Sequence, residues 1–164
     1  MVHRIIDSPV GELTLVGAGD GLSGVYFAEH VRRPTEELFG PRDQDAFPRV
    51  AEQLAEYFAG ERKSFDLLLR PNGNAFQCKV WAQLAQIPYG QTRTYRQLAT
   101  TLGAPGLARA VGAANGQNPL SIIVPCHRVV GADGRLTGYA GGLDRKAFLL
   151  DLEAPPVATL LSLF

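Results

Sequence analysis

The sequence predicts an α+β fold with two domains, a strand-rich one over residues 1–70 and a mostly helical one over residues 71–164. Short apolar runs separated by turn residues come first along the chain, and helically spaced apolar residues follow. The charge also changes, because the first part holds 8 basic and 12 acidic side chains and the second holds 8 and 4. With 164 residues and 46% hydrophobic content, the chain can bury a core.

The first predicted domain begins with a small antiparallel β-sheet. Three apolar runs, at residues 3–7, 12–17 and 22–28, are separated by Ser8-Pro9-Val10-Gly11 and by Gly19-Asp20-Gly21. Segments of this composition are typical of turns between antiparallel strands, so we expect three strands joined by two turns.

A loop, a helix and a further strand complete this domain. Residues 31–47 are polar and contain two prolines, which indicates a loop. Residues 47–58 then predict a helix, which ends at Gly60, and residues 65–69 can add a fourth strand. The apolar residues at helical spacing in this segment are Val50, Leu54 and Tyr57 or Phe58.

The second domain is predicted to start after Pro71-Asn72-Gly73, with a helix over residues 75–86 that ends before Pro88. Thr94 is a suitable N-cap for another helix over residues 95–102. A turn at 103–106 and a helix over 107–115 follow, which together give a helix-turn-helix outline. Any two short helices with a glycine turn give this outline, so it does not establish DNA binding alone.

The second helix of this outline contains one long polar side chain, Arg109, among small residues. Such a helix can approach a ligand closely, but it offers little for reading base edges, because base readout needs several polar side chains. It therefore favours DNA binding without sequence specificity. The alternative is a helix whose small residues pack against a neighbouring helix.

Charge is consistent with a polyanionic partner only locally. The 16 basic and 16 acidic side chains cancel over the whole chain. Residues 67–132, however, contain no Asp or Glu, so phosphates would meet no repulsion there. A sparsely charged core segment would give the same pattern. The basic residues of this stretch are Arg70, Lys79, Arg93, Arg96, Arg109 and Arg128.

The cysteine count and the apolar pattern suggest a soluble cytoplasmic protein without a membrane partner. Cys78 and Cys126 are too few for a disulfide framework and fit a reducing compartment. No signal-like start and no run of about 18 apolar residues occurs in the sequence. Because two cysteines in a reducing compartment stay unpaired, the sequence allows a free reactive thiol.

Cys126 stands in the segment Pro125-Cys126-His127-Arg128, directly after an apolar run at residues 122–124 that predicts a buried strand. A thiol at a strand end beside His and Arg favours the thiolate, its nucleophilic form. On extended backbone, neighbouring side chains point to opposite faces, so His127 would reach the sulfur only through a water or a bend. Cysteine is also often an inert buried residue, which is the interpretation we keep for Cys78.

Four segments of the C-terminal part decide between these interpretations, because they resemble the O6-alkylguanine-DNA alkyltransferase family. They are IPYGQTRTY at 87–95, GAPGLARAVGAANGQNP at 103–119, IIVPCHRVVGADG at 122–134 and GYAGGLDRKAFLLDLE at 138–153. The resemblance implies a ribonuclease-H-like N-terminal sheet with a helix and a winged-helix-like C-terminal domain. It also implies repair of O6-alkylguanine, and possible repair of O4-alkylthymine, by irreversible transfer of the alkyl group to the protein itself.

The resemblance assigns a role to each residue of the site. Cys126 is the alkyl acceptor, His127 its base through a water, and Glu153 the residue that orients His127. Tyr95 protonates the leaving guanine at N3, and Asn118 holds the loop before the cysteine. Val129, Tyr139, Ala140 and Gly141 are expected to form the base pocket.

The same family resemblance places double-stranded DNA against the second helix, from the minor groove, with the target base rotated out of the stack. Arg109 is expected to fill the vacated space. The predicted DNA contacts are Tyr95, Ala108, Arg109, Ala110, Gly112, Ala113 and Arg128. We expect a monomer that can line up with further copies along DNA.

Two departures from the family pattern are present. Ala140 stands where some members have a serine that can contact O6, so only a backbone N–H can serve here. Some members hold zinc in the N-terminal domain, but residues 1–70 contain no cysteine and only His3 and His30. We therefore expect neither a structural metal nor a cofactor.

Two other classes of function compete with this interpretation. Alkyltransferase-like proteins bind lesions without repairing them after losing the cysteine, but Cys126 is present here. A cysteine hydrolase would leave the helix-turn-helix with its small second helix unexplained.

Overall fold

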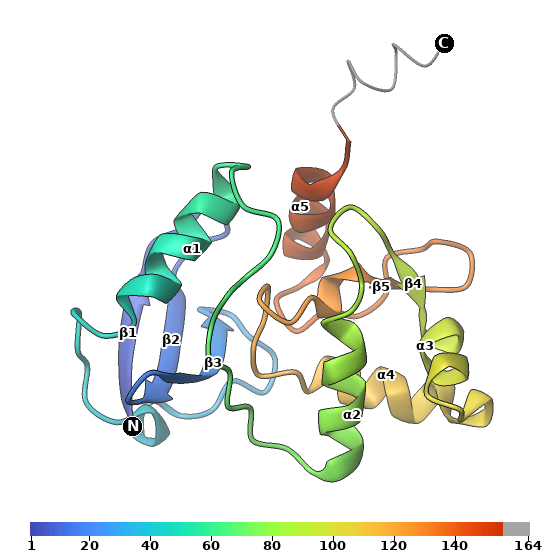
Figure 1. The fold of residues 1–164 in the computed structure, drawn as a ribbon, viewed down its shortest axis with the longest axis horizontal. Helices are drawn as coiled ribbons and strands as arrows, with labels where there is room; N and C mark the ends of the chain where they lie inside the picture. Colours follow the sequence, from blue (N-terminus) through green and yellow to red (C-terminus); the bar gives the residue numbers. More distant parts are fainter. Residues whose placement is uncertain (156–164) are drawn as a thin grey trace.

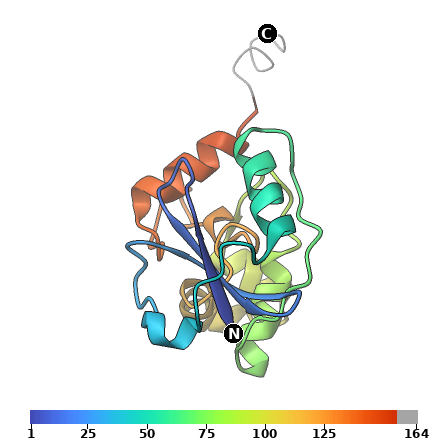
Figure 2. The same cartoon turned by 90° about the vertical axis from the view of Figure 1, so that its left-hand side faces the viewer.

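The computed structural model describes residues 1–155, so the end of the second predicted domain, residues 156–164, lies outside the described residues. The N-terminal part contains an antiparallel sheet of β1 (Val2–Ile6), β2 (Leu13–Ala18) and β3 (Gly21–Phe27), in the order β1-β2-β3. Helix α1 (Pro48–Phe58) lies against this sheet (Figures 1 and 2). The three predicted strands and the first predicted helix are therefore confirmed.

The C-terminal part is mostly helical. Its elements are α2 (Ala75–Leu84), β4 (Arg93–Thr94), α3 (Tyr95–Thr101), the 3₁₀ turn η2 (Pro105–Leu107), α4 (Ala108–Gly116), the 3₁₀ turn η3 (Cys126–Arg128), β5 (Val129–Val130) and α5 (Leu143–Glu153). Another 3₁₀ turn, η1 (Glu36–Phe39), interrupts the loop predicted in the N-terminal part. Figure 1 shows the sheet and α1 on one side of the molecule and α2, α3 and α4 on the other, with α5 between them.

The predicted start of the helix-turn-helix is accurate to the residue. The Thr94 side chain accepts a hydrogen bond from the Gln97 backbone N–H, and the Gln97 side chain returns one to the Thr94 N–H. This capping box satisfies two backbone donors that the first turn of α3 leaves without helical partners. A glycine in the left-handed region, Gly103 at φ 74°, then allows the chain to turn toward α4.

Two predicted strands are wrong. Residues 65–69 touch the sheet at one point, where the Leu22 N–H bonds the Leu68 carbonyl and the Arg70 N–H bonds the Leu22 carbonyl. Residues 122–124 form a turn, in which Ile122 has a φ of 73°. The apolar run is buried as expected, but a short buried turn and a short buried strand have the same composition.

One continuous core joins the two parts of the described chain. It contains Leu15 and Phe27 from the sheet, Tyr57 from α1, Trp81 from α2 and Leu149 from α5. The Val25 N–H of β3 also donates to the Pro119 carbonyl at 2.8 Å. The sheet therefore supports the segment that leads to Cys126. Within residues 1–155, no helix is long and apolar enough to cross a membrane.

Candidate active site

Cys126 is the first residue of η3 and lies in the core, with 4% of its surface exposed. Burial raises the pKa of its thiol, and the Asn118 side chain and the Lys146 ammonium offset only part of this rise. The expectation that the sequence neighbours favour a resting thiolate is therefore wrong, because removal from water disfavours the charged form. Cys78, expected to be buried, is instead exposed on α2.

His127 and Glu153 form a buried pair beneath the cysteine turn. The Nε2 atom of His127 lies 2.7 Å from Oε2 of Glu153, and both side chains are almost completely excluded from solvent. Burial alone would raise the pKa of Glu153, but hydrogen bonds from His127, Arg128 and Tyr57 hold it at about 2. Glu153 is therefore ionised and accepts every one of these hydrogen bonds.

This ionised carboxylate fixes the tautomer of His127. Burial lowers the pKa of His127, and the bond to Glu153 opposes this only in part, so the imidazole is neutral. Because Oε2 of Glu153 can only accept, Nε2 carries the proton and Nδ1 carries the lone pair. Nδ1 is buried and has no hydrogen-bond partner among the described residues. The imidazole is thus prepared to accept a proton at the nitrogen that remains unpaired.

Arg128 belongs to this network and is buried. Its Nε and Nη2 atoms donate to Glu153 at 2.7 and 3.0 Å, and Nη1 donates to the Ile87 carbonyl at 2.7 Å. The residue is only 6% exposed. The prediction that Arg128 contacts DNA is wrong, since its guanidinium is used to compensate a buried carboxylate.

Tyr57 of α1 is a member of the network that the sequence analysis placed only in the core. Its hydroxyl donates to Oε2 of Glu153 at 2.5 Å, although 96 positions separate the two residues. Helical spacing correctly indicated an inward-facing Tyr57 or Phe58 but not the partner of the hydroxyl. The N-terminal part therefore contributes a direct hydrogen bond to the candidate active site.

Asn118 organises the turn that precedes the cysteine. Its Nδ2 donates to the Val124 carbonyl at 2.8 Å, and its Oδ1 accepts from the Leu120 N–H at 3.0 Å. The side chain is buried and thus replaces the pairing that a strand would have supplied to these backbone groups. This placement agrees with the role that the resemblance gives Asn118.

A cleft of about 420 Å³ opens beside α4. It brings together five of the predicted site residues, which are Tyr95, Gly112, Ala113, Tyr139 and Ala140. The cleft is lined by Val31, Arg32, Tyr95, Gly112, Ala113, Asn115, Gly116, Gly138, Tyr139 and Ala140. The loop of the N-terminal part at Val31 and Arg32, which the sequence did not indicate, is fixed there by a 2.8 Å bond from the Val31 N–H to the Ala140 carbonyl.

Two predicted pocket residues do not line this cleft. Val129 is completely buried in β5, and Gly141 lies so close to the Phe27 ring that an added Cβ would come within 2.5 Å of it. Their contribution is to the packing beneath the cleft. Gly141 is required there because of this close approach.

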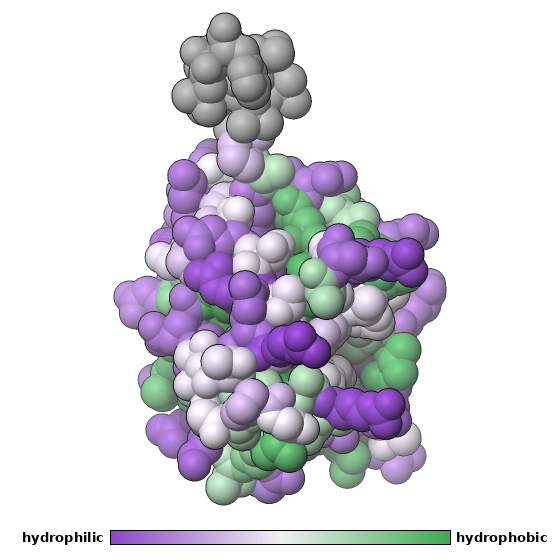
Figure 3. All heavy atoms as spheres, turned by 90° about the vertical axis from the view of Figure 1, so that its right-hand side faces the viewer, coloured by the Kyte–Doolittle hydropathy of each residue, from purple (hydrophilic) through white to green (hydrophobic). Residues whose placement is uncertain are grey.

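Helix α4 has one buried and one accessible side, so both interpretations of its small residues apply. Val111, Ala114 and Asn115 are buried, and the Trp81 Nε1–H of α2 donates to the Ala114 carbonyl at 2.8 Å. Arg109 and Ala113 are exposed, while Ala108, Ala110 and Gly112 are half-buried. In Figure 3, which views the side of the molecule where α3 lies, hydrophilic residues are scattered among neutral and apolar ones.

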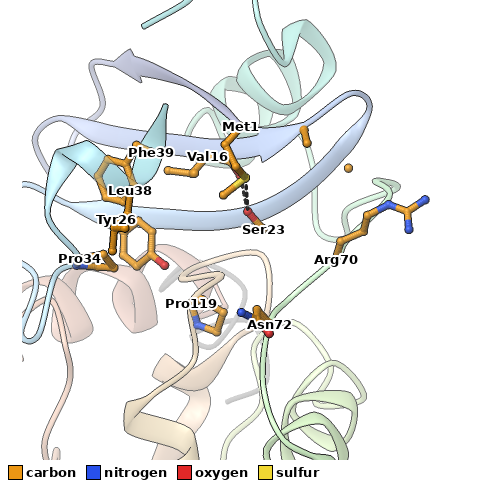
Figure 4. A pocket seen from close by; sticks show the side chains of 12 residues that line it. Met1, Val16, Ser23, Tyr26, Pro34, Leu38, Phe39, Arg70, Asn72 and Pro119 are labelled. Carbon is orange, nitrogen blue, oxygen red and sulfur yellow. Dashed lines mark hydrogen bonds between the residues drawn. The ribbon is translucent and has the colours of Figure 1, made fainter. Parts of the chain in front are cut away.

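A second hollow, of about 480 Å³, lies between the sheet and the η1 loop. Its lining is largely apolar, and Figure 4 shows Tyr26, Leu38 and Phe39 on one side of it and Arg70 and Asn72 on the other. No cysteine, histidine or carboxylate side chain is among the residues that line it. The described residues also contain no group of His, Cys, Asp and Glu side chains that could hold a metal ion.

The geometry defines a class of α+β proteins with a buried thiol, a buried His–Glu pair and, beside the helix-turn-helix, a cleft that Cys126 itself does not line. Comparison with known families specifies it further. The model of the 6-O-methylguanine DNA methyltransferase ribonuclease-like domain matches residues 1–71, and the model of the DNA-binding domain of the same family matches residues 75–155. The chain belongs to this family.

Individual relatives agree with this result over nearly the whole chain. The methylated-DNA--protein-cysteine methyltransferase of Mycobacterium bovis is 51% identical and covers 100% of this chain and 99% of its own length. The protein of that name from Methanosarcina acetivorans is 49% identical over 93% of this chain and 98% of its own length. The crystal structure of Mycobacterium tuberculosis OGT in complex with DNA has a TM-score of 0.90, with 51% identity and coverage of 94% and 96%.

Proposed function

We propose that this protein repairs DNA by transferring the alkyl group of O6-alkylguanine to the sulfur of Cys126, once per molecule. Family membership and the names of the relatives support the reaction. The observation that carries the assignment to Cys126 is the neutral His127, whose unpaired Nδ1 belongs to the residue next to the thiol. Cys78 is exposed, and its thiol hydrogen-bonds only the Gly73 carbonyl among the described residues.

The reaction begins with a proton transfer, because the buried cysteine rests as a thiol. His127 accepts the thiol proton at Nδ1, through a water, and the ionised Glu153 stabilises the resulting imidazolium. In the nonpolar surroundings of Cys126 the thiolate that forms is poorly solvated, so its free energy falls when it attacks carbon. Burial thus keeps Cys126 unreactive in the absence of substrate, and His127 activates it by accepting its proton.

Sulfur then attacks the carbon bonded to O6 of guanine. A carbon–sulfur bond forms as the carbon–oxygen bond breaks, and the electron pair of that bond goes to the guanine. Tyr95, which lines the cleft, gives its proton to the base, so neutral guanine leaves. No step uses a metal or a cofactor. The product is a thioether, which has no path back to the thiol, so the protein is consumed.

The DNA complex is proposed to form on the accessible side of α4. The half-buried and exposed small residues allow the helix to lie close to the minor groove, and one arginine, Arg109, projects from that side. Base contacts with so few polar side chains cannot specify a sequence. The alkylated nucleotide rotates out of the duplex into the cleft, and Arg109 takes its place in the stack.

Intact-mass analysis after incubation with duplex DNA that contains O6-methylguanine tests this proposal. We expect each chain to gain one methyl group, found on the peptide that contains Cys126. Cys78→Ser should react like the wild type, and Cys126→Ser should not react. Methyl groups on Cys78, or more than one per chain, would contradict the proposal.

A further inference from the structure

Tyr95 makes one side-chain hydrogen bond in the described part of the protein, and its partner is not a residue that the sequence indicated. Its hydroxyl lies 2.9 Å from Oγ1 of Thr137, which is 42 positions away in the loop between β5 and α5. Either oxygen can be the donor in this bond. Gly138, next to Thr137, lines the same cleft as Tyr95, so the bond lies at the edge of the space proposed for the base.

Lys146 of α5 fixes the backbone of Thr137 by a hydrogen bond. Its Nζ donates to the Thr137 carbonyl at 2.7 Å, and the lysine is completely buried. Burial lowers the pKa of Lys146 to about 8, and proximity to Cys126 opposes this decrease. Removing an ammonium from water is costly unless it is hydrogen-bonded, so the bond from Lys146 constrains the position of the Thr137 carbonyl.

We propose that Thr137 is a positioning residue for the reaction, whose hydroxyl donates a hydrogen bond to the Tyr95 oxygen while Tyr95 gives its proton to the leaving guanine. This inference rests on the proposed function. The proton that reaches guanine comes from Tyr95, negative charge develops on the phenolic oxygen, and Thr137 keeps its own proton. The charge on Tyr95 is later neutralised by a proton from solvent.

The physical argument concerns when the hydrogen bond is strongest. Hydrogen bonds to an ionised oxygen are about twice as strong as bonds between neutral groups. The Thr137–Tyr95 bond therefore strengthens as the proton leaves Tyr95, and an interaction that strengthens in the transition state increases the rate rather than the affinity. Rotation about a single torsion of Thr137 can also present a lone pair to Tyr95 before the substrate enters, which fits the resting geometry.

Thr137→Ser and Thr137→Ala form a matched pair, because both lack the methyl group and differ only in the hydroxyl. Single-turnover transfer to Cys126 from free O6-benzylguanine and from methylated duplex DNA is the measurement. We expect Thr137→Ser to react like the wild type and Thr137→Ala to react about five- to tenfold more slowly on both substrates, the loss of one hydrogen bond. Affinity for DNA should be the same in both variants.

The same pair combined with Tyr95→Phe separates positioning from a general effect on the loop. Without the Tyr95 hydroxyl, Thr137→Ser and Thr137→Ala should react at equal rates. Equal rates with Tyr95 present, or the same rate difference with Tyr95→Phe, would overturn the proposal. If wild-type protein transferred no alkyl group to Cys126, the proposed function itself would fail, and this outcome is distinguishable from the others.

Discussion

Arg109 lies on α4 and Arg128 is the last residue of η3, but their surroundings in the fold are opposite. Arg128 is buried and donates three hydrogen bonds, two of them to Glu153. Arg109 is exposed on α4. One region is a network of buried charges assembled from distant elements, and the other is a weakly charged surface formed by consecutive residues of one helix.

The difference shows why the distribution of charge along the chain gave a wrong prediction for Arg128. The acid-free stretch over residues 67–132 suggested that phosphates would meet no repulsion there. Glu153, the partner of Arg128, lies outside this stretch, and only the fold brings the two together. An arginine beside a catalytic cysteine can serve a buried carboxylate as well as a ligand.

The comparison can be tested on unfolding free energy, with the largest change expected for Arg128. Arg128→Met keeps the bulk of the side chain but leaves Glu153 buried with less compensation. Breaking a buried ion pair by removing one partner costs about 3 to 5 kcal/mol, which urea unfolding resolves. Adding Glu153→Gln should recover part of this loss. A variant that is as stable as the wild type but binds DNA weakly would restore the prediction made from the sequence.

Tyr57→Phe tests the contribution of the N-terminal part to the same network. Loss of a hydrogen bond to a charged group lowers the unfolding free energy by about 1.5 to 3 kcal/mol at pH 7. The pKa of Glu153 is about 2 in the folded protein against 4.5 ordinarily, so its stabilisation is present above pH 4.5 and is lost as the pH falls toward 2.

The variant should therefore differ from the wild type most at neutral pH. Removal of one donor raises the pKa of Glu153 toward its ordinary value, so the difference in stability between the two proteins narrows as the pH falls from 4.5 to 2. Thermal unfolding across this range is the measurement. Phe58→Tyr is a matched control, since it changes a hydroxyl on the neighbouring residue. A difference that is constant with pH would show that Tyr57 acts through packing alone.

The distinction between features formed by neighbouring residues and features assembled from distant elements also explains what the sequence could predict. The strands β1 to β3 and the start of α3 depend on local patterns, such as turn residues and the capping box of Thr94, and these were predicted correctly. The turn at residues 122–124 depends on Asn118, whose side chain takes over backbone hydrogen bonds. No local pattern reveals that exchange.

Residues of the site divide in the same way. Cys126 and His127 were identified through a contiguous segment, whereas Tyr57 is joined to Glu153 only through the tertiary fold. Lys146 had a usable signal, because it shares a face of α5 with Leu149 and Glu153 at helical spacing, and all three are buried. Once Glu153 was expected to face His127, Lys146 could have been placed inward as well.

Arg109→Ala is expected to have the smallest effect on stability and the clearest effect on DNA repair. The side chain is exposed and forms no ion pair among the described residues, so its removal should change the unfolding free energy by less than about 0.5 kcal/mol. Base rotation costs a few kcal/mol in duplex DNA and nothing for a free base. The variant should therefore repair duplex DNA much more slowly but react normally with O6-benzylguanine.

Arg49→Ala is the matched control for that experiment, because Arg49 is an exposed arginine on α1, in the N-terminal part. It should lose neither reaction. A duplex of the same length with the alkylated base opposite an abasic site refines the test, since the base there has no pairing partner and needs less help to leave the stack. If Arg109→Ala is slow on the ordinary duplex and recovers on this substrate, Arg109 acts on base rotation. Equal slowing on both duplexes would instead assign Arg109 to phosphate binding. If Arg109→Ala also reacted more slowly with O6-benzylguanine, the accessible side of α4 and the cysteine turn would not be independent regions.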